Sequence, residues 1–195
     1  SYAMFSPGRS WEQIRTTIAY NKTNVKIIGA HAGVSVGPDG ATHQAIEDMA
    51  IMRVMPNMSV IAPADMNEAR VATIYAAEHE GPLYIRLARN DTPVVLKEGI
   101  KFEFGRAEWL VKKDRSASDG VGIVVTGTLV YEALVAAKEL NDQGIATSVL
   151  HMPTVKPLDT KALEELAAEH QFVITLEEHQ RAGGLGGAVS EHLSL

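Results

Sequence analysis

The stretch His31-Ala-Gly-Val-Ser-Val-Gly-Pro-Asp-Gly-Ala-Thr-His-Gln44 decides the fold, because it directly follows a short apolar run at residues 25–30. Its three glycines allow sharp turns and a close approach of the backbone to a ligand. His31, Asp39 and His43 bring proton-transfer and hydrogen-bonding groups to the same segment. An apolar strand, a glycine-rich loop and then a helix are typical of a site at the carboxyl end of a parallel sheet.

The composition of the 195-residue chain is ordinary for a globular protein with a sizeable core, at 46 % hydrophobic and 22 % charged residues. A net charge of −6 argues against nucleic-acid binding, which needs a basic stripe, so anionic substrates require local cations. The absence of cysteine excludes disulfides and thiolate catalysis, and it fits a cytoplasmic enzyme. No apolar run approaches the roughly 18 residues that suggest a membrane span, so no membrane partner is expected.

Strands and helices are predicted to alternate along the chain. Apolar runs rich in β-branched residues predict strands at 25–30, 59–62, 83–88, 123–125, 145–150 and 172–176. Capping residues predict helices that start at Ser10, Thr42, Asp65, Thr128 and Asp159 or Thr160, and that end near residues 20, 53, 80, 143 and 170. This repetition implies right-handed crossovers and mainly parallel sheets.

Residues 93–120 differ in character and are interpreted as a linker between one domain over 1–92 and another over 121–195. Rough alternation at 102–111 predicts a strand or hairpin, and the polar run at 112–120 predicts a solvated turn. The chain starts and stops abruptly, so we expect a fragment or a subunit with missing ends.

The glycine-rich stretch and its continuation through residues 45–65 resemble the pyrimidine-domain signature of transketolases. Residues 2–14 are similar to the C-terminal subunit of split bacterial and archaeal enzymes, and residues 175–187 to the family's C-terminal domain. The likeness extends over essentially the whole chain. It implies an α/β fold of two three-layer α/β/α domains, an incomplete pyrimidine-binding domain followed by a transketolase C-terminal domain.

The resemblance also implies roles for four residues around thiamine diphosphate. Phe5 matches the position that stacks on the aminopyrimidine ring, and Tyr2 matches a second aromatic beside it; without the likeness, both would be read as core. His43 matches the catalytic histidine that assists proton movement, although a lone histidine there would more often start a helix. Asp39 matches a residue that recognises a substrate hydroxyl, and Asp-Gly is also an ordinary turn pair.

Two further residues are expected to bind the sugar phosphate. His31 matches a residue at the mouth of the site, where a plain surface histidine would look the same. Arg89 matches the phosphate-binding arginine, whose guanidinium fork fits phosphate oxygens; an exposed ion pair is the alternative. Strand alternation predicts that Arg86 and Arg89 face opposite sides.

The glycine-rich segment 183–187 has no P-loop lysine, so nucleotide binding is rejected and a tight turn that packs the last domain against its neighbour is preferred. Glu177, Glu178 and His179 are adjacent on an extended segment and cannot all face one ion, so they are interpreted as interface or structural residues. No metal ligands are predicted in this chain.

The family's activating glutamate would precede Ser1, and its Mg²⁺ and diphosphate ligands lie on a domain whose motif is not found here. The resemblance therefore implies an N-terminal transketolase subunit as partner, in a homodimer or heterotetramer, and a chain that is inactive alone. The expected reaction moves a two-carbon ketol unit between ketose and aldose phosphates, as in the pentose phosphate pathway. Alternatives are 1-deoxyxylulose-5-phosphate synthase, the β subunit of a 2-oxoacid dehydrogenase, and an assembly module without its own cofactor site.

Overall fold

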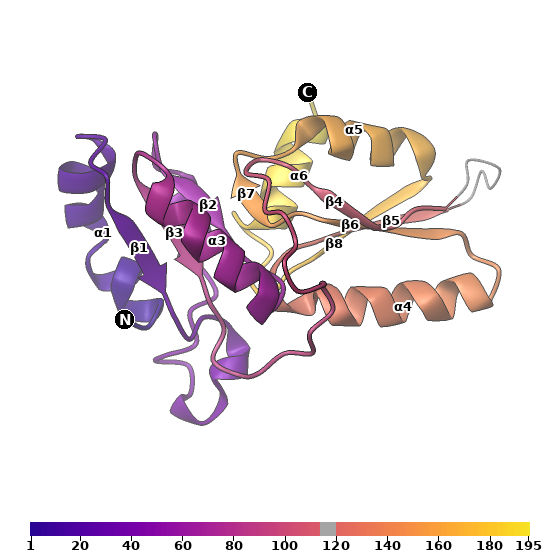
Figure 1. The fold of residues 1–195 in the computed structure, drawn as a ribbon, viewed down its shortest axis with the longest axis horizontal. Coiled ribbons are helices and arrows are strands. Elements are labelled where there is room, and N and C mark those ends of the chain that lie inside the picture. Colours follow the sequence, from indigo (N-terminus) through magenta and orange to yellow (C-terminus); the bar gives the residue numbers. More distant parts are fainter. Residues whose placement is uncertain (114–119) are drawn as a thin grey trace.

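The computed structural model describes residues 1–113 and 120–195, which form two four-stranded sheets side by side (Figure 1). The strand order is β1-β3-β2-β7 in the first sheet and β4-β6-β5-β8 in the second. In each sheet three strands are parallel and one edge strand is antiparallel. The prediction of mainly parallel sheets is confirmed. Most of the polar run predicted as a turn, residues 114–119, lies outside the described residues.

The first sheet takes one strand from the far half of the chain. Its parallel strands are β1 (Lys26–Gly29), β3 (Leu83–Arg86) and β2 (Ser59–Ile61). The fourth strand, β7 (Thr154–Lys156), runs antiparallel to β2. The sequence predicted no strand there, because three residues are too few to establish an alternation and the pairing with β2 stabilises the segment. The two halves of the chain thus share one sheet.

The second sheet lies entirely in the C-terminal half. Its strands are β4 (Glu108–Val111), β6 (Thr147–His151), β5 (Val121–Val125) and β8 (Phe172–Leu176). The strand predicted within the linker exists as β4, and it forms the antiparallel edge of this sheet. Strand β8 forms the opposite edge.

Helices cover both faces of each sheet. They are α1 (Trp11–Gln13) continued by a wider π-helical segment, η2 (Ile14–Ala19), then α2 (Asp48–Arg53), α3 (Met66–Glu78), α4 (Val130–Asp142), α5 (Thr160–Glu169) and α6 (Leu185–Leu193). In Figure 1, α4 lies on one side of the second sheet and α5 and α6 lie on the other. In the described parts of the chain, no helix combines the length and apolar character that a membrane crossing would need.

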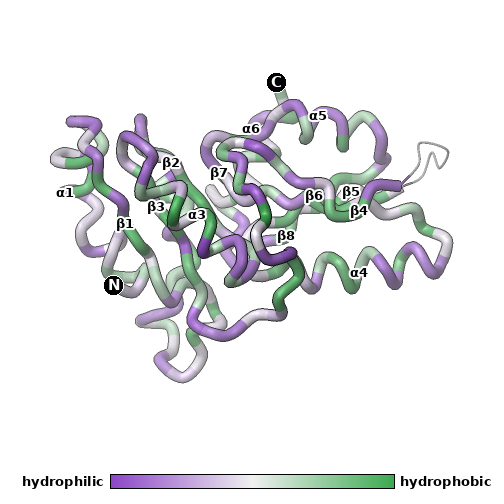
Figure 2. The backbone as a smooth tube through the Cα atoms, viewed as in Figure 1, coloured by the Kyte–Doolittle hydropathy of each residue, from purple (hydrophilic) through white to green (hydrophobic). Residues whose placement is uncertain are grey.

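The core confirms a three-layer arrangement in each half. Alternate residues of the first sheet meet the methionines of α2 on one face and the alanines of α3 on the other. In the second sheet, β5 places Ile123 and Val125 against α4, and it places Val124 against α5 and α6. Figure 2 shows the corresponding pattern in α4, where hydrophobic and hydrophilic segments alternate along the helix. This alternation is expected for a helix that buries one face.

Two of the five predicted helix caps are confirmed, whereas Ser10, Thr42 and Thr128 make no cap hydrogen bond. The Asp65 carboxylate accepts a hydrogen bond from the Glu68 N–H at 3.1 Å, and Asp159 accepts from Ala162 at 3.2 Å. Ser10 makes no side-chain cap bond. Thr128 lies in a short turn before α4, and its hydroxyl turns towards Glu178 instead.

A buried ion pair joins the two halves. Nε2 of His151, on β6, lies 2.8 Å from the Glu68 carboxylate on α3, and both side chains are buried. Burial disfavours the charged imidazolium. The charge and hydrogen bond of Glu68, with smaller contributions from the Val125 carbonyl and Glu108, outweigh that effect, so the pKa of His151 lies above its ordinary value.

This pair makes stability pH-dependent. Because the pKa of His151 is higher in the folded chain than in the unfolded one, its contribution is fully present below about pH 6.5 and is lost as pH rises through the folded pKa. Between the two values we expect the free energy of unfolding to fall by up to about 1.4 kcal/mol per pH unit. Urea unfolding from pH 5.5 to 9 measures this slope, and His151→Gln should flatten it. An identical slope in the variant would contradict the assignment to His151.

Candidate functional site

Four aromatic rings from three separate segments meet at the carboxyl end of β1. Phe5 and His43 are in edge contact with 5.3 Å between ring centroids, and Tyr2 lies 5.6 Å from His43 and 4.3 Å from His31. Tyr2 and Phe5 are nearly parallel, 6.3 Å apart. The structure therefore brings together Tyr2, Phe5, His31 and His43, which we call the ring cluster. All four are half-buried, so part of each residue remains exposed.

The N-terminal segment reaches the cluster by pairing with the end of β1. The Ala3 N–H donates to the Ala30 carbonyl at 2.7 Å, which places Tyr2 beside His31. Phe5 follows in a turn of wide helix, Met4–Arg9, and the Arg9 guanidinium lies 4.9 Å from the centroid of the Phe5 ring. A cation over one ring face leaves Phe5 only its remaining surface for a flat ligand.

We call residues Gly33 to Ala45 the site loop. A helix was predicted to start within it, at Thr42, but no helix starts there. The helix α2 starts only at Asp48. The backbone N–H groups of His43 and Gln44 both donate to the Gly40 carbonyl, which closes a turn instead of a helix. Positive φ angles at the loop's three glycines, +88°, +68° and +73°, allow this path. The predicted helix exists and ends at Arg53 as expected, but its predicted start was wrong because these turns use the backbone donors that a helix would need.

The site loop also carries the two residues predicted to act on the substrate, His43 and Asp39. The Thr42 hydroxyl is hydrogen-bonded to Nδ1 of His43 at 2.8 Å, which orients the imidazole. The Asp39 carboxylate lies 3.3 Å from the Arg89 guanidinium, whose Nη1 also donates to the Val36 carbonyl at 2.6 Å. Both members of this ion pair are about one third exposed, at 34 % for Arg89 and 29 % for Asp39. Five of the six predicted site residues thus belong to the loop or contact it.

Beneath the site loop lies a buried polar network that the sequence did not predict. Nε of Arg86 lies 3.0 Å from the Asp48 carboxylate, and the Tyr84 hydroxyl donates to the same carboxylate at 2.6 Å. Burial and the neighbouring Asp48 raise the pKa of the Tyr84 phenol well above its usual range, so it remains a donor at neutral pH. Arg86 points into this network, whereas Arg89 contacts the middle of the loop at Val36 and Asp39. The signal available in the sequence was an arginine within an otherwise apolar strand, at Arg86.

The C-terminal half contacts the loop through the segment after β8. Oε1 of Glu178 accepts a hydrogen bond from the Ser35 N–H at 2.7 Å, and the Glu178 carbonyl accepts from Nη2 of Arg86 at 2.6 Å. The neighbouring Glu177 carboxylate accepts from the N–H groups of Leu185 and Gly186 at the start of α6. The interpretation of Glu177 and Glu178 as interface or structural residues is confirmed.

The segment 183–187 joins the two halves as predicted. Nε of Arg53, the last residue of α2, donates to the Gly183 carbonyl at 2.9 Å. The same guanidinium pairs with Glu191 of α6 at 2.7 Å. The anion held at the start of α6 is the chain's own Glu177, which leaves those N–H groups no role in binding a phosphate.

The ring cluster fits the pyrimidine end of thiamine diphosphate. Phe5 and Tyr2 provide flat apolar faces, and Nδ1 of His31 is buried without a hydrogen-bond partner among the described residues. Within residues 1–113 and 120–195, no group of three or more His, Asp or Glu side chains is placed to hold a metal ion.

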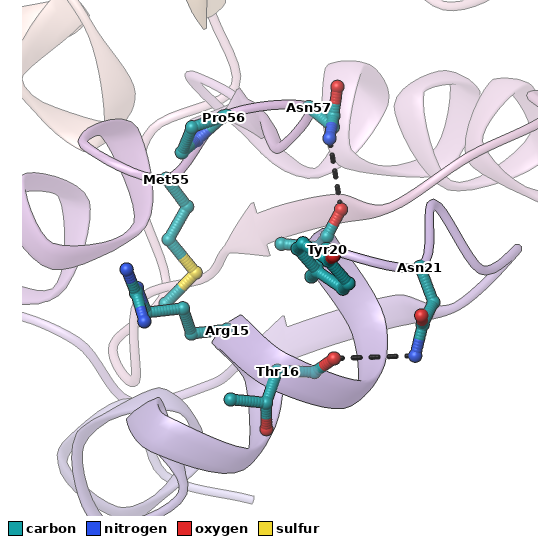
Figure 3. A pocket seen from close by; sticks show the side chains of 8 residues that line it. Arg15, Thr16, Tyr20, Asn21, Met55, Pro56 and Asn57 are labelled. Carbon is teal, nitrogen blue, oxygen red and sulfur yellow. Dashed lines mark hydrogen bonds between the residues drawn. The ribbon is translucent and has the colours of Figure 1, made fainter.

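A separate pocket of about 640 Å³, shown in Figure 3, is lined by no residue of the ring cluster. It lies between η2 and the turn after α2, and its lining includes Arg15, Tyr20 and Met55. The amide of Asn57 donates to the Ala19 carbonyl, and that of Asn21 donates to Thr16. The side-chain amides of Asn21 and Asn57 are therefore already hydrogen-bonded to the chain. None of the predicted site residues lines this pocket, so we assign it no chemistry.

Comparison with known proteins agrees with this geometry. Residues 1–94 match the model of the transketolase pyrimidine-binding domain, and residues 110–195 match that of the transketolase C-terminal domain. A Methanocaldococcus jannaschii protein, provisionally named as a transketolase C-terminal section, is 44 % identical over 98 % of this chain and 58 % of its own length. One of the subunits of an apulose-4-phosphate transketolase from Actinobacillus succinogenes is 36 % identical over 97 % of this chain and 59 % of its own.

A solved structure of a split-gene transketolase, an inactive β4 tetramer, is 46 % identical with a TM-score of 0.89. The match covers 99 % of this chain and 61 % of that structure's chain, so this chain spans roughly three fifths of the length of these three relatives. The two α/β halves in this order define a pyrimidine-binding domain followed by a C-terminal domain. The chain belongs to the transketolase family and corresponds to its C-terminal section.

Proposed function

We propose that this chain is the C-terminal part of a thiamine diphosphate-dependent transketolase that transfers a two-carbon ketol unit between ketose and aldose phosphates. The observation that carries the proposal is the ring cluster, in which Phe5 and His43 meet at 5.3 Å at the end of a parallel strand. In this proposal Phe5 and Tyr2 hold the pyrimidine ring, and His43 and Asp39 act on the substrate. His31 and Arg89 bind it.

The cofactor, when bound, supplies the electron sink that stabilises a carbanion, and the protein supplies position and proton transfer. Phe5 presents a half-buried ring against which a heteroaromatic ring can stack. His43 is oriented by Thr42 through Nδ1, so its Nε2 is the nitrogen that can exchange a proton with a hydroxyl near the rings. These two residues can therefore perform complementary tasks, one for the cofactor and one for the substrate.

The proposed phosphate end of the substrate site is the Arg89 guanidinium. It is one third exposed, and only Nη1 is bonded to the described part of the chain, through Val36 and Asp39. The remaining nitrogens have no partner in the described residues and can form the paired bonds that phosphate oxygens favour. Because the net charge is −6, a local cation of this kind is needed to hold an anionic sugar.

The proposal requires an N-terminal transketolase subunit as partner, because the resemblance places the family's Mg²⁺ and diphosphate ligands on that subunit. The solved split-gene relative supports this requirement, because as a β4 tetramer it is inactive. We propose a heterotetramer or a homodimer of joined subunits, acting in the cytoplasm. The similarity to an apulose-4-phosphate transketolase means that the sugar phosphate need not be one of the pentose phosphate pathway.

The alternative enzymes differ from a transketolase in the donor substrate that they would use. A synthase of 1-deoxyxylulose 5-phosphate or a 2-oxoacid dehydrogenase would take pyruvate or another oxoacid as donor. The relatives named above are transketolases, which favours a ketose phosphate instead. An assembly module without a cofactor site would contribute contacts only, and substitutions in the ring cluster would then leave activity unchanged.

Phe5→Ala tests the proposed function. A stacking contact worth about 0.5–1.5 kcal/mol beyond area burial implies a rise of about 2- to 12-fold in the thiamine diphosphate concentration needed for half-maximal activity. The measurement is a coupled assay of this chain with its partner subunit, given a ketose phosphate and an aldose phosphate, or pyruvate. Phe172→Ala, at an exposed phenylalanine of the edge strand β8, serves as control. Turnover with pyruvate alone, or no effect of Phe5→Ala, would contradict the proposal.

A further inference from the structure

We propose that Glu178 of the C-terminal half is a positioning residue that sets the shape of the site loop and thereby the placement of Asp39 and His43. The inference rests on the proposed function, because it concerns residues assigned to that reaction. It gives the C-terminal domain a part in catalysis, although none of its residues belongs to the ring cluster.

The first residues of the loop, Gly33 to Ser35, pack closely against the Glu178 carboxylate. Oε1 accepts a hydrogen bond from the Ser35 N–H at 2.7 Å. A Cβ atom at Gly33 would collide with the same carboxylate, and the φ of +88° there already favours glycine. Glycine at position 33 thus lets the carboxylate approach the backbone closely enough to bind it.

The last residue of the loop, Ala45, and the next residue, Ile46, are linked by hydrogen bonds to residues 178–180. Nη2 of Arg86 donates both to the Glu178 carbonyl at 2.6 Å and to the Ala45 carbonyl at 3.4 Å. The Gln180 N–H donates to the carbonyl of Ile46, one residue beyond the loop, at 3.0 Å. Residues 178–180 therefore contact both ends of the loop, where the Gly33 N–H also donates to the Ala45 carbonyl at 2.8 Å.

Between these ends the loop is held mainly by polar contacts. Val36 is its one fully buried large apolar side chain. The loop's polar contacts include those of Arg89 with the Val36 carbonyl and the Asp39 carboxylate. The Gln44 amide also donates to the carbonyls of Val34 and Gly37. A loop with so little apolar burial depends on its anchors, so release at Ser35 would let Asp39 and His43 shift together.

A carboxylate suits this position because a charged acceptor makes a stronger bond to a backbone N–H than a neutral one. The network behind it keeps Glu178 in place, since Arg86, which binds its carbonyl, is itself fixed by the buried Asp48. Glu178→Gln retains an acceptor oxygen of similar reach. Glu178→Ala removes it and leaves the Ser35 N–H without that partner.

Hydrogen exchange of the reconstituted complex tests the contact directly. We expect Glu178→Ala to lose protection at the Ser35 amide, and Glu178→Gln to keep most of it. Glu177→Ala is the matched control, because the neighbouring carboxylate binds only the start of α6 and should leave the loop protected. If Glu178→Ala fails to fold, Glu178→Asp, which withdraws the carboxylate by one methylene, takes its place.

Steady-state kinetics on the same variants tests the consequence. We expect Glu178→Ala to lower kcat by up to about 100-fold, the effect of misplacing reacting groups by about 1 Å, with a smaller change in the KM for the sugar phosphates. Glu178→Gln should restore most of kcat. Unchanged exchange at Ser35, or a kcat that falls equally in Glu177→Ala, would overturn the inference. An inactive wild-type complex would instead contradict the proposed function, and the exchange result alone would then decide whether Glu178 holds the loop.

Discussion

Replacing His43 with alanine should lower kcat of the reconstituted complex by about 10²–10⁴-fold, the usual cost of removing one acid–base group. The imidazole contacts Phe5 and Tyr2 by its edge, and Thr42 occupies its Nδ1. Its other nitrogen is therefore the one available for proton exchange. The measurement is kcat at saturating cofactor and both sugar phosphates, so that weaker binding does not hide the chemical step.

The control for His43 is a histidine with a similar local setting but no place in the site. His192 on α6 is also partly exposed, and it is paired with Glu164 at 2.8 Å. We expect His192→Gln to leave kcat unchanged. His43 is only half-buried, so His43→Ala should remain folded, and an unchanged kcat in a folded His43→Ala complex would remove it from the reaction.

Replacing Asp48 with alanine should lower the free energy of unfolding by about 3–5 kcal/mol, because it leaves the Arg86 charge buried without its partner. Both side chains are almost completely buried, at 5 % exposure for Arg86 and 1 % for Asp48. The substitution also deprives the Tyr84 hydroxyl of its acceptor at 2.6 Å, which adds to the loss. Urea unfolding of the chain, followed by circular dichroism, gives the two free energies.

An exposed ion pair provides the comparison. Lys112 and Glu165 are both about two fifths exposed, so Glu165→Ala should cost no more than about 1 kcal/mol. Equal losses in the two variants would mean that Asp48 and Arg86 do not form the buried pair described above. Because this network underlies the site loop, Asp48→Ala should also lower the activity of any complex that it still forms.

The sequence was sufficient for the elements whose signals are local. Asp65 and Asp159 predicted their helices because a carboxylate at the N-cap binds the backbone N–H three residues later. The apolar runs predicted six of the eight strands for a similar reason, since a short apolar run rich in β-branched residues can be recognised without its pairing partner. The resemblance of residues 2–14, 31–65 and 175–187 then indicated the family. In the structure Phe5 and His43 lie together in the ring cluster, as the hypothesis required.

Where the predictions failed, other contacts had replaced the expected ones. Thr42 did not start a helix because the site loop's turns use the N–H groups of His43 and Gln44. Thr128 did not cap α4, and its hydroxyl lies towards Glu178, fifty residues away in the chain. Strand β7 escaped prediction because its three residues form a strand only through pairing with β2.

By itself, the sequence determined which groups the chain offers: flat rings at Tyr2 and Phe5, imidazoles at His31 and His43, and local cations in a chain of net charge −6. Only the tertiary structure decided which of them meet, and that Arg86 and Glu178 contact the site loop. The physical reason is that residue type and spacing fix local backbone preferences and burial. An ion pair or a hydrogen bond between residues far apart in the chain depends on how the sheets bring the chain back on itself.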